Sequence, residues 1–191
     1  MFRLNCKILN REMSMTKDAL FPQWALDKFD IIGDSIVAFK GPFDMTEEEF
    51  YNLSEKRPGE LKLSGKEMLH FIIEHFNNKI SLSVYRQYLL VSIVEEKLVR
   101  RKTKVGIIRW GEDIYDEDKI LSVSVITANA VSTKIHLGLF IEDDEDNGIR
   151  GLKHFDILPE EFAEIAVSQY RAEFKRLADK TSTIRILSQN E

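Results

Sequence analysis

Lys119 begins a segment in which apolar and polar side chains alternate, Lys119-Ile120-Leu121-Ser122-Val123-Ser124-Val125. Alternation with a period of two is typical of a β-strand, and it puts Ser122 and Ser124 on one face. A lysine at the start of a strand can project into a cleft, where its ammonium stabilises negative charge that develops on a phosphate or carbonyl oxygen. The alternative is a solvated lysine at a strand edge, since most lysines are exposed. The pattern alone favours the solvated lysine, and Lys119 is kept as a candidate for catalysis.

Glu67, His70 and Glu74 form a second candidate group. Ser64 and Glu67 have the spacing of a capping box, which predicts a helix that runs to about Phe76. In a helix, these three residues would lie on one face, so the two carboxylates could orient the imidazole. A histidine held in this way can act as a base or bind a metal, although a complete metal site needs donors from elsewhere. The alternative is a surface helix that carries ion pairs.

Two charged runs have simpler explanations than a functional site. The acidic run at residues 142–148 resembles a calcium loop, but its twelfth position is His154, where the loop needs a bidentate glutamate. We therefore expect a mobile, solvated connection there. A basic cluster complements the negative end of a helix dipole; it consists of Lys97, Arg100, Arg101, Lys102 and Lys104. Both glycine-rich nucleotide motifs are missing from the sequence, so the cofactor is left open.

The composition is that of an ordinary globular protein. A chain of 191 residues can bury a core without disulfides, which predicts one domain over residues 1–191. The net charge of −5 argues against nucleic acid as a partner. Cys6 is the only cysteine, which fits a reducing compartment. The sequence has no leader pattern and no apolar run long enough for a bilayer, so we expect a cytoplasmic protein without a membrane partner.

The hydrophobic periodicity predicts an α+β fold with a central mixed, largely antiparallel sheet flanked by helices. Strands are expected at residues 2–9, 31–40, 105–110, 119–127, 132–141 and 183–187. Helices are expected at residues 17–28 with a break at Pro22, after the capping box at Thr46, at 65–76, at 82–101 and from Pro159 onward. An exposed edge strand would allow a two-fold homodimer.

Three segments together resemble a family of archaeal and thermophile proteins labelled only as a domain of unknown function. They are residues 32–42, 68–76 and 119–141. The resemblance spans most of the chain. It implies one conserved domain without an assigned activity.

The chain also resembles, more distantly, the biotin and lipoate protein ligases and the lipoyl (octanoyl) transferases, whose α+β catalytic domain is shared with class II aminoacyl-tRNA synthetases. Those enzymes have a strand that opens Gly-x-Lys-Ile-Ala and a second strand of the type Gly-Leu-Ala-Leu-Asn-Val. The corresponding segments here are Lys119-Ile120-Leu121-Ser122 and His136-Leu137-Gly138-Leu139-Phe140-Ile141. Lys119 matches their active-site lysine, and Lys40-Gly41-Pro42 stands at a place similar to their His-Gly-Pro turn.

The chain departs from this pattern at several positions. The transferase nucleophile is a cysteine after the second strand, whereas this chain has no cysteine after Cys6. Phe140 stands where the second strand of the family has asparagine, and Lys40 where the turn has histidine. The arginine and glycine-rich loop that orders the adenylate in biotin ligases is also missing. The resemblance therefore does not extend to a thioester route or to a particular substrate.

The resemblance implies an enzyme of the ligase and acyltransferase class that binds a small carboxylic acid or its activated form. Lys119 would neutralise developing charge, Lys40 and the Gly41 amide would hold an anionic group, and His70 with Glu74 would border the pocket or move a proton. Other candidates to line the pocket are Asp34, Ser35, Ser122, Ser124 and His136. One alternative is a noncatalytic module that binds a metabolite or nucleotide on the same fold. Another is metal-dependent hydrolysis by Glu67, His70 and Glu74.

Overall fold

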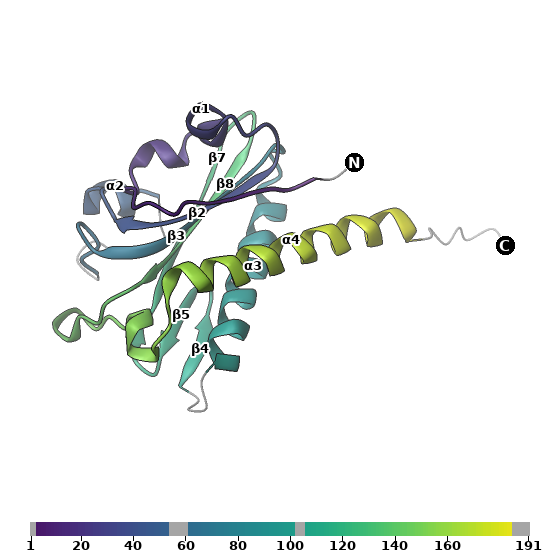
Figure 1. Cartoon of the computed structure of the whole chain (residues 1–191). Helices are drawn as coiled ribbons and strands as arrows, with labels where there is room; N and C mark the ends of the chain where they lie inside the picture. Colours follow the sequence, from purple (N-terminus) through teal and green to yellow (C-terminus); the bar gives the residue numbers. More distant parts are fainter. Residues whose placement is uncertain (1–2, 54–60, 102–105, 185–191) are drawn as a thin grey trace.

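The computed structural model of the chain describes residues 3–53, 61–101 and 106–184. Its centre is a five-stranded sheet with the strand order β1-β2-β3-β8-β7 (Figure 1). The strands are β1 (Asn5–Ile8), β2 (Ser35–Pro42), β3 (Glu67–His75), β7 (Ser122–Ala128) and β8 (Thr133–Phe140). β1 is parallel to β2, and the other neighbouring pairs are antiparallel. The predicted α+β fold with a largely antiparallel central sheet is confirmed.

Two long helices cover one face of this sheet, and short helices cover the other (Figure 1). The long helices are α3 (Ile80–Arg101) and α4 (Pro159–Thr183). The short ones are η1 (Lys17–Leu20), α1 (Trp24–Phe29) and α2 (Glu47–Tyr51). A second, three-stranded sheet contains β4 (Ile107–Trp110), β5 (Asp113–Asp116) and β6 (Lys119–Ile120). Two short turns, η2 (Glu145–Asn147) and η3 (Leu152–Phe155), connect β8 to α4.

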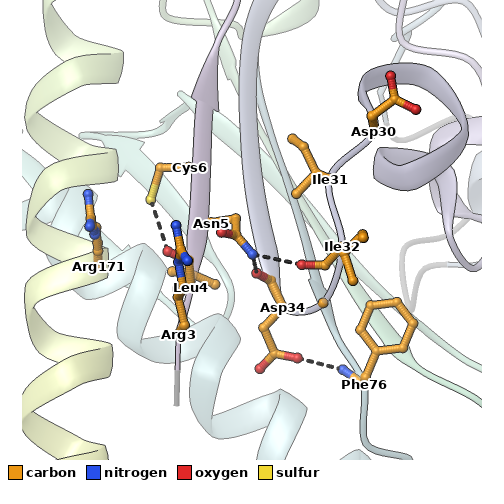
Figure 2. Close-up of a pocket in the computed structure, with 11 residues that line it drawn as sticks. Arg3, Leu4, Asn5, Cys6, Asp30, Ile31, Ile32, Asp34, Phe76 and Arg171 are labelled. Carbon is orange, nitrogen blue, oxygen red and sulfur yellow. Dashed lines mark hydrogen bonds between the residues drawn. The ribbon is translucent and has the colours of Figure 1, made fainter. Parts of the chain in front are cut away.

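β1 forms one edge of the five-stranded sheet, and side-chain bonds fasten its start to the loop before β2. The Asn5 side-chain amide donates to the carbonyl of Ile32 at 2.8 Å and to that of Asp34 at 3.3 Å (Figure 2). The backbone N–H of Asn5 also donates to the Asp34 carbonyl, at 2.9 Å. The predicted first strand is thus confirmed over residues 5–8.

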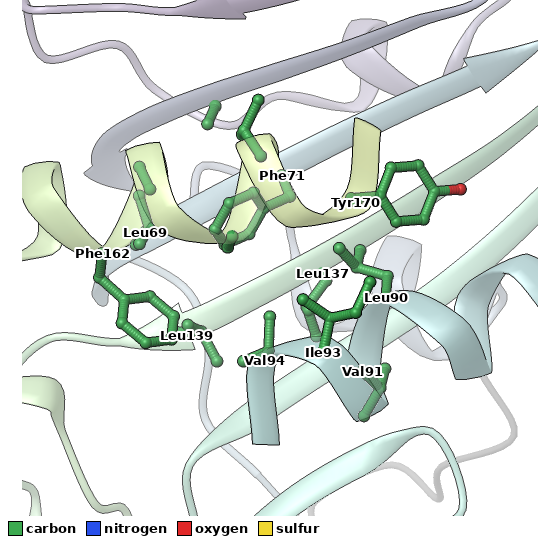
Figure 3. Close-up of a cluster of buried hydrophobic side chains, with 14 of the residues drawn as sticks. Leu69, Phe71, Leu90, Val91, Ile93, Val94, Leu137, Leu139, Phe162 and Tyr170 are labelled. Carbon is green, nitrogen blue, oxygen red and sulfur yellow. The ribbon is translucent and has the colours of Figure 1, made fainter. Parts of the chain in front are cut away.

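The main core lies between the sheet and the two long helices. Leu69 and Phe71 of β3 point toward α4 and α3, together with Leu137 of β8 (Figure 3). Phe162 and Tyr170 of α4 are fully buried against them. Because side chains alternate along a strand, the neighbouring residues of β3 and β8 must face the opposite side, under α1 and α2. That second face carries several buried polar groups.

The helix predicted at residues 65–76 is wrong, because this segment forms the central strand β3. Gly65 has a φ of +76°, which is a left-handed turn conformation rather than the first turn of a helix. From Met68 to His75 every residue is buried, since helices cover both faces of the strand. A strand buried on both sides has a nearly continuous apolar sequence without alternation, so its period does not distinguish it from a buried helix.

The other predicted elements are largely confirmed, with shifted ends. The break at Pro22 separates η1 from α1, the capping box at Thr46 is formed, and α3 and α4 begin close to the expected residues. The strand predicted at residues 119–127 is divided into β6 and β7 at Leu121. The strand predicted at 183–187 is wrong at its start, where Thr183 ends α4 and Ile184 is the C-cap; residues 185–187 lie outside the described residues. Residues 102–105, which include Lys102 and Lys104, also lie outside them. No helix among the described residues has the length and apolar character that a membrane crossing requires.

Candidate functional site

Two histidines lie next to each other on the face of the sheet that α1 and α2 cover. His70 belongs to β3 and His136 to β8, and both are fully buried. His70 Nε2 lies 3.0 Å from the carbonyl oxygen of Gly41, and His70 Nδ1 lies 3.1 Å from His136 Nε2. Since a carbonyl only accepts, His70 Nε2 carries its proton and Nδ1 accepts from His136. The remaining nitrogen, His136 Nδ1, has no hydrogen-bond partner within the described part of the chain.

Burial keeps both imidazoles neutral. Burial lowers the pKa of His70 to about 3, against a smaller opposing effect of the hydrogen bond to Gly41. The pKa of His136 is also well below its usual value, because of burial and of the neighbouring His70. Phe39 packs against the His70 ring with the ring centroids 5.1 Å apart. The pair is therefore a neutral link between β2, β3 and β8 at ordinary pH, rather than a charged acid.

Glu74 and Lys134 form an ion pair inside the protein. They are opposite each other in the β3–β8 register, with Lys134 Nζ 3.2 Å from Glu74 Oε2. Glu74 Oε1 accepts from the Ser132 hydroxyl at 2.7 Å and from the backbone N–H of Gln23 at 2.8 Å. The Lys134 ammonium lies 5.4 Å from the ring centroid of Trp24. Burial lowers the pKa of Lys134, and the attraction of Glu74 opposes this effect. Both carboxylate oxygens of Glu74 are bound by groups of the protein itself, which is typical of a residue with a structural role.

Lys119 lies in the other sheet, at the start of β6. Its ammonium pairs with the carboxylate of Glu145 in η2. Lys66 directly precedes β3 and pairs with Asp144, the residue before Glu145. The hydrogen bond from Lys66 lowers the pKa of Asp144. Two lysines from distant parts of the sequence therefore meet two consecutive carboxylates. The Lys119 side chain is 21% exposed and that of Glu145 is 63% exposed.

Arg150 joins the same group of charges. Its Nη1 lies 2.6 Å from Asp143 Oδ2 and 3.4 Å from Glu145 Oε1, and its Nε lies 3.1 Å from Asp116 Oδ2. We refer to Lys66, Lys119, Arg150, Asp144 and Glu145 as the lysine–carboxylate cluster. The acidic run was expected to be a mobile, solvated connection, but two lysines that are distant in sequence and the nearby Arg150 bind it. A charge pattern read along one segment does not reveal partners of this kind.

Lys40 and Gly41 are neighbours on β2 and make contacts on different sides of the strand. The Lys40 ammonium lies 3.0 Å from Glu12 and 3.5 Å from Glu160 of α4, on the side of the long helices. A Cβ atom at Gly41 would overlap the backbone of Met13, so glycine is needed for this close approach. The Lys40 ammonium and the residue pair at Gly41 and His70 therefore lie on opposite faces of the strand.

Asp34 and Ser35 lie at the start of β2. Asp34 Oδ2 lies 2.8 Å from His75 Nδ1, and His75 Nε2 lies 3.2 Å from the Tyr170 hydroxyl. Burial acts to raise the pKa of Asp34, but the interactions with His75, the backbone N–H of Phe76 and Arg86 together outweigh it, and the net pKa is lowered. Ser35 is buried opposite Glu74 in the β2–β3 register. Asp34 thus belongs to an Asp34–His75–Tyr170 chain beneath α4, separate from the histidine pair.

Ser122 and Ser124 share one face of β7, as the alternation predicts, and both are buried. The Ser124 hydroxyl donates to the carbonyl of His136 at 2.7 Å and accepts from the Gln87 amide at 2.8 Å. The Ser122 hydroxyl accepts from the backbone N–H of Ile114 at 2.9 Å. Ser124 and Gln87 also line a hollow of about 400 Å³ between α3 and β7.

The three residues proposed as a metal site do not assemble. On strand β3, Glu67 faces the side opposite to His70 and Glu74. Within the described ranges, no group of three or more histidine, cysteine, aspartate or glutamate side chains could hold a metal ion. Lys66 and Lys134 were missed as site residues. Lys134 is two residues before His136 on β8 and therefore shares its face of the strand, so the alternation of the strand could have revealed it. The contact of Lys66 with Asp144 depends on the tertiary fold and has no such local signal.

Comparison with known proteins places the chain in a family. A model for a domain of unknown function, DUF366, matches residues 4–185. An uncharacterized protein of Methanocaldococcus jannaschii, MJ0805, is 35% identical over 150 residues, which is 76% of this chain. The match spans 64% of that relative's length. Neither comparison supplies an activity.

Solved structures extend the likeness in fold. A protein of unknown function from Pyrococcus horikoshi has a TM-score of 0.79 and 28% identity, covering 97% of this chain and 100% of that one. A lipoate-protein ligase A bound with ATP has a TM-score of 0.55 and 11% identity, covering 90% of this chain and 86% of that one. A biotin protein ligase from Aquifex aeolicus in complex with biotin and ATP has a TM-score of 0.55 and 12% identity, covering 94% of this chain and 73% of that one. Both resemblances predicted from the sequence are confirmed, the ligase one at the level of the fold. The chain belongs to the DUF366 family.

Proposed function

We propose that this chain is a ligase-like or acyltransferase-like enzyme that binds a small carboxylic acid, or its acyl or adenylate form, at the lysine–carboxylate cluster. One observation carries the proposal: Lys66 and Lys119 converge on the neighbouring carboxylates Asp144 and Glu145. A pair of ammonium groups held together in this way is a receptor for a carboxylate or phosphate, because each can exchange its internal partner for an external anion.

The exposure of the two partners favours such an exchange at Lys119. The Lys119 side chain is mostly covered, whereas the Glu145 carboxylate extends into solvent. Because Glu145 is largely exposed, its carboxylate is already hydrated and can turn away from Lys119 when an external anion takes its place. Lys119 would then stabilise negative charge on the bound acyl group or on its activated phosphate. The match of Lys119 to the active-site lysine of the ligase and transferase families supports the same role.

The structure suggests a positioning role for His70 and Glu74 in this proposal. Both are fully buried and hydrogen-bonded to other parts of the sheet. They hold β2, β3 and β8 in one register, and Lys66 directly precedes β3. The ligand-binding roles of Asp34, Ser35, Lys40, Gly41, Ser122, Ser124 and His136 remain a proposal, secondary to the lysine–carboxylate cluster. We further propose that residues 1–191 act as one domain, since one core joins both sheets to α3 and α4.

A noncatalytic binding module on the same fold is the second candidate. It is favoured by the position of Cys6, which lies on the edge strand β1 and not near the lysine–carboxylate cluster. Burial raises the pKa of the Cys6 thiol, which disfavours the reactive thiolate. A covalent route through Cys6 is therefore not proposed. An adenylate route needs no thiol and stays within the proposal.

The binding step is tested by thermal shift with a panel of biotin, lipoate, octanoate and amino acids, each with and without ATP. The matched variants are Lys119→Ala and Lys17→Ala, since Lys17 of η1 also forms a lysine–glutamate pair, with Glu49 of α2. We expect at least one acid to raise the melting temperature of the wild type and of Lys17→Ala, but not of Lys119→Ala. Equal shifts in all three proteins would contradict the assignment of Lys119.

A further inference from the structure

The hollow of about 400 Å³ between α3 and β7 has no part in the proposed function, and we call it the β7 hollow. α3 forms one of its walls, since Ile80, Val84 and Tyr88 follow one another at helical spacing. From Ile80 to Tyr88 the helix rises by about 12 Å, so the hollow is elongated. Most of its described lining is aliphatic and consists of Leu53, Ile80, Val84, Val125, Ile126 and Ala128.

Gln87 brings an unused hydrogen-bond acceptor to this hollow. The residue is 5% exposed, and its Nε2 donates to the Ser124 hydroxyl at 2.8 Å. That hydroxyl donates its single proton to the carbonyl of His136, so the group of Gln87 that faces it must be the NH2 group. The side-chain oxygen Oε1 of Gln87 therefore points away from Ser124. In the described part of the chain it accepts no hydrogen bond, and it is not among the fully buried atoms that lack a partner. It is open to the hollow that Gln87 lines.

Glu112, in the turn between β4 and β5, adds a carboxylate to the same end of the hollow. Arg109 joins this turn to α3, because its guanidinium lies 5.2 Å from the centroid of the Tyr88 ring and donates to the carbonyl of Gly111 at 2.8 Å. Glu112 therefore lies at the end of the hollow that Gln87 and Tyr88 form. Among the described residues, the half-buried Glu112 side chain forms no ion pair and no hydrogen bond, with Arg109 or any other group.

The opposite end of the hollow is aliphatic. Ala128 lies there, near the start of α3, because its partner in the β7–β8 register is Thr133, whose hydroxyl accepts from Ser83. The N-terminus of α3 is at this end too, but a helix dipole acts only within the first turn and does not reach the Tyr88 end. The described residues that line the hollow include the carboxylate of Glu112 but no lysine, arginine or histidine. The hollow thus has one end with unused acceptors and one apolar end.

We infer that the β7 hollow binds a small primary amine, with the ammonium group at Glu112 and Gln87 and the apolar body along α3 toward Ile80. An ammonium group has three donors and no acceptor, which matches two acceptors that have no partner in the protein. A carboxylic acid would instead bring a second negative charge to Glu112. The volume lies within the range of about 300–1,000 Å³ that is usual for small-molecule sites. This inference does not depend on the proposed function at Lys119.

The test compares hexylamine with hexanol and hexanoate, which have the same apolar body and a neutral or an anionic end. Dissociation constants are measured by chemical-shift titration of the isotope-labelled full chain, which also shows where each compound binds. We expect hexylamine to bind at least about tenfold more tightly than hexanol, because its contact with Glu112 is charge-assisted. The backbone amide signals of Gln87, Glu112 and Ser124 should shift with the amine and not with hexanoate.

Two variants test the two acceptors. Glu112→Gln keeps the size of the side chain and removes its charge, so it should weaken the binding of hexylamine by about tenfold and leave that of hexanol unchanged. The control, Glu117→Gln, makes the same change in net charge at an exposed residue of the next turn, between β5 and β6, and should bind both compounds normally. Gln87→Met removes the open oxygen from a side chain of similar size and should weaken the binding of the amine by about threefold or more.

The hollow itself has its own variant. Val84→Phe places a ring between the two ends of the hollow and should abolish the binding of both hexylamine and hexanol, while circular dichroism and the melting curve report whether the chain still folds. The inference is overturned if hexylamine does not bind, or if hexanol or hexanoate binds in the hollow as tightly as the amine. It is also overturned if Glu112→Gln binds hexylamine as tightly as the wild type, because the ammonium group would then not meet this carboxylate.

Discussion

His70 and His136 share a hydrogen bond of 3.1 Å in the interior of the sheet, and the carbonyl of Gly41 fixes the direction of its proton. Both rings are neutral when the protein is folded, because burial lowers the pKa of His70 to about 3 and that of His136 well below its usual value. In the unfolded chain both regain a pKa near 6.5. Folding therefore releases protons at acid pH.

This pair predicts a loss of stability in acid. Between pH 6.5 and about 3 the unfolded chain binds more protons than the folded one, so the free energy of unfolding falls as the pH falls. Each histidine contributes a slope of at most about 1.4 kcal/mol per pH unit, and above pH 6.5 the slope disappears. Urea denaturation across this range measures it. His136→Gln should reduce the slope relative to the wild type, and equal slopes in the two proteins would contradict the buried neutral pair.

A second prediction concerns the buried ion pair. Lys134→Met leaves the Glu74 carboxylate buried without its cation, which should lower the free energy of unfolding by about 3–5 kcal/mol. The double variant Lys134→Met with Glu74→Gln should recover a large part of this loss, because no charge is left buried. Urea denaturation of the single and double variants measures both effects. A double variant less stable than Lys134→Met would show that Glu74 does not need the lysine charge.

Two glycines of the site predict a contrast in packing. Gly41→Ala would place a methyl group on the backbone of Met13, which cannot move without displacing the chain. Gly138→Ala would place it 2.7 Å from the end of the flexible Met68 side chain and 3.2 Å from the His136 ring. We expect Gly138→Ala to cost about 1–3 kcal/mol and Gly41→Ala to cost more. Thermal unfolding of the two variants measures the two costs. A larger loss of stability in Gly138→Ala than in Gly41→Ala would contradict the close approach at Gly41.

The internal partner of Lys119 predicts a gain in binding. Glu145→Gln removes the carboxylate that occupies the Lys119 ammonium. The free energy of unfolding should change by less than about 1 kcal/mol, because Glu145 is largely exposed. Calorimetric titration with the acid identified by thermal shift should show tighter binding than in the wild type. Glu142→Gln, which removes a similar exposed partner from Lys153, is the control and should leave the affinity unchanged. Weaker binding in Glu145→Gln would mean that Glu145 helps to hold the ligand.

The sequence predicts elements best where one face is exposed. α3 and α4 carry apolar stripes at helical spacing, and β7 alternates, so their type and position follow from local pattern. β3 is buried on both faces and has lost the alternation, which explains why residues 65–76 resembled a helix. The error changed the site directly, because on a strand His70 and Glu74 face one side and Glu67 the other.

The contacts of the candidate site are long-range and could not be predicted in the same way. His70 meets His136 and Gly41 only because β2, β3 and β8 are neighbours in a particular register. Lys119 was identified by its resemblance to the ligase lysine, but its partner Glu145 belonged to a run read as a solvated loop. Lys66 gave no local signal beyond a charged residue after a glycine. Strand order and register, which set these contacts, are not encoded in any single segment.

The most direct test of catalysis at Lys119 is exchange of labelled pyrophosphate into ATP in the presence of each acid of the panel. If the chain activates a carboxylic acid as an adenylate, one acid should drive exchange in the wild type and in Lys17→Ala. In Lys119→Ala the rate should fall by about 100-fold or more, as expected when a group that stabilises developing negative charge is removed. Exchange that persists unchanged in Lys119→Ala, or the lack of exchange with every acid that binds, would contradict the proposed enzyme.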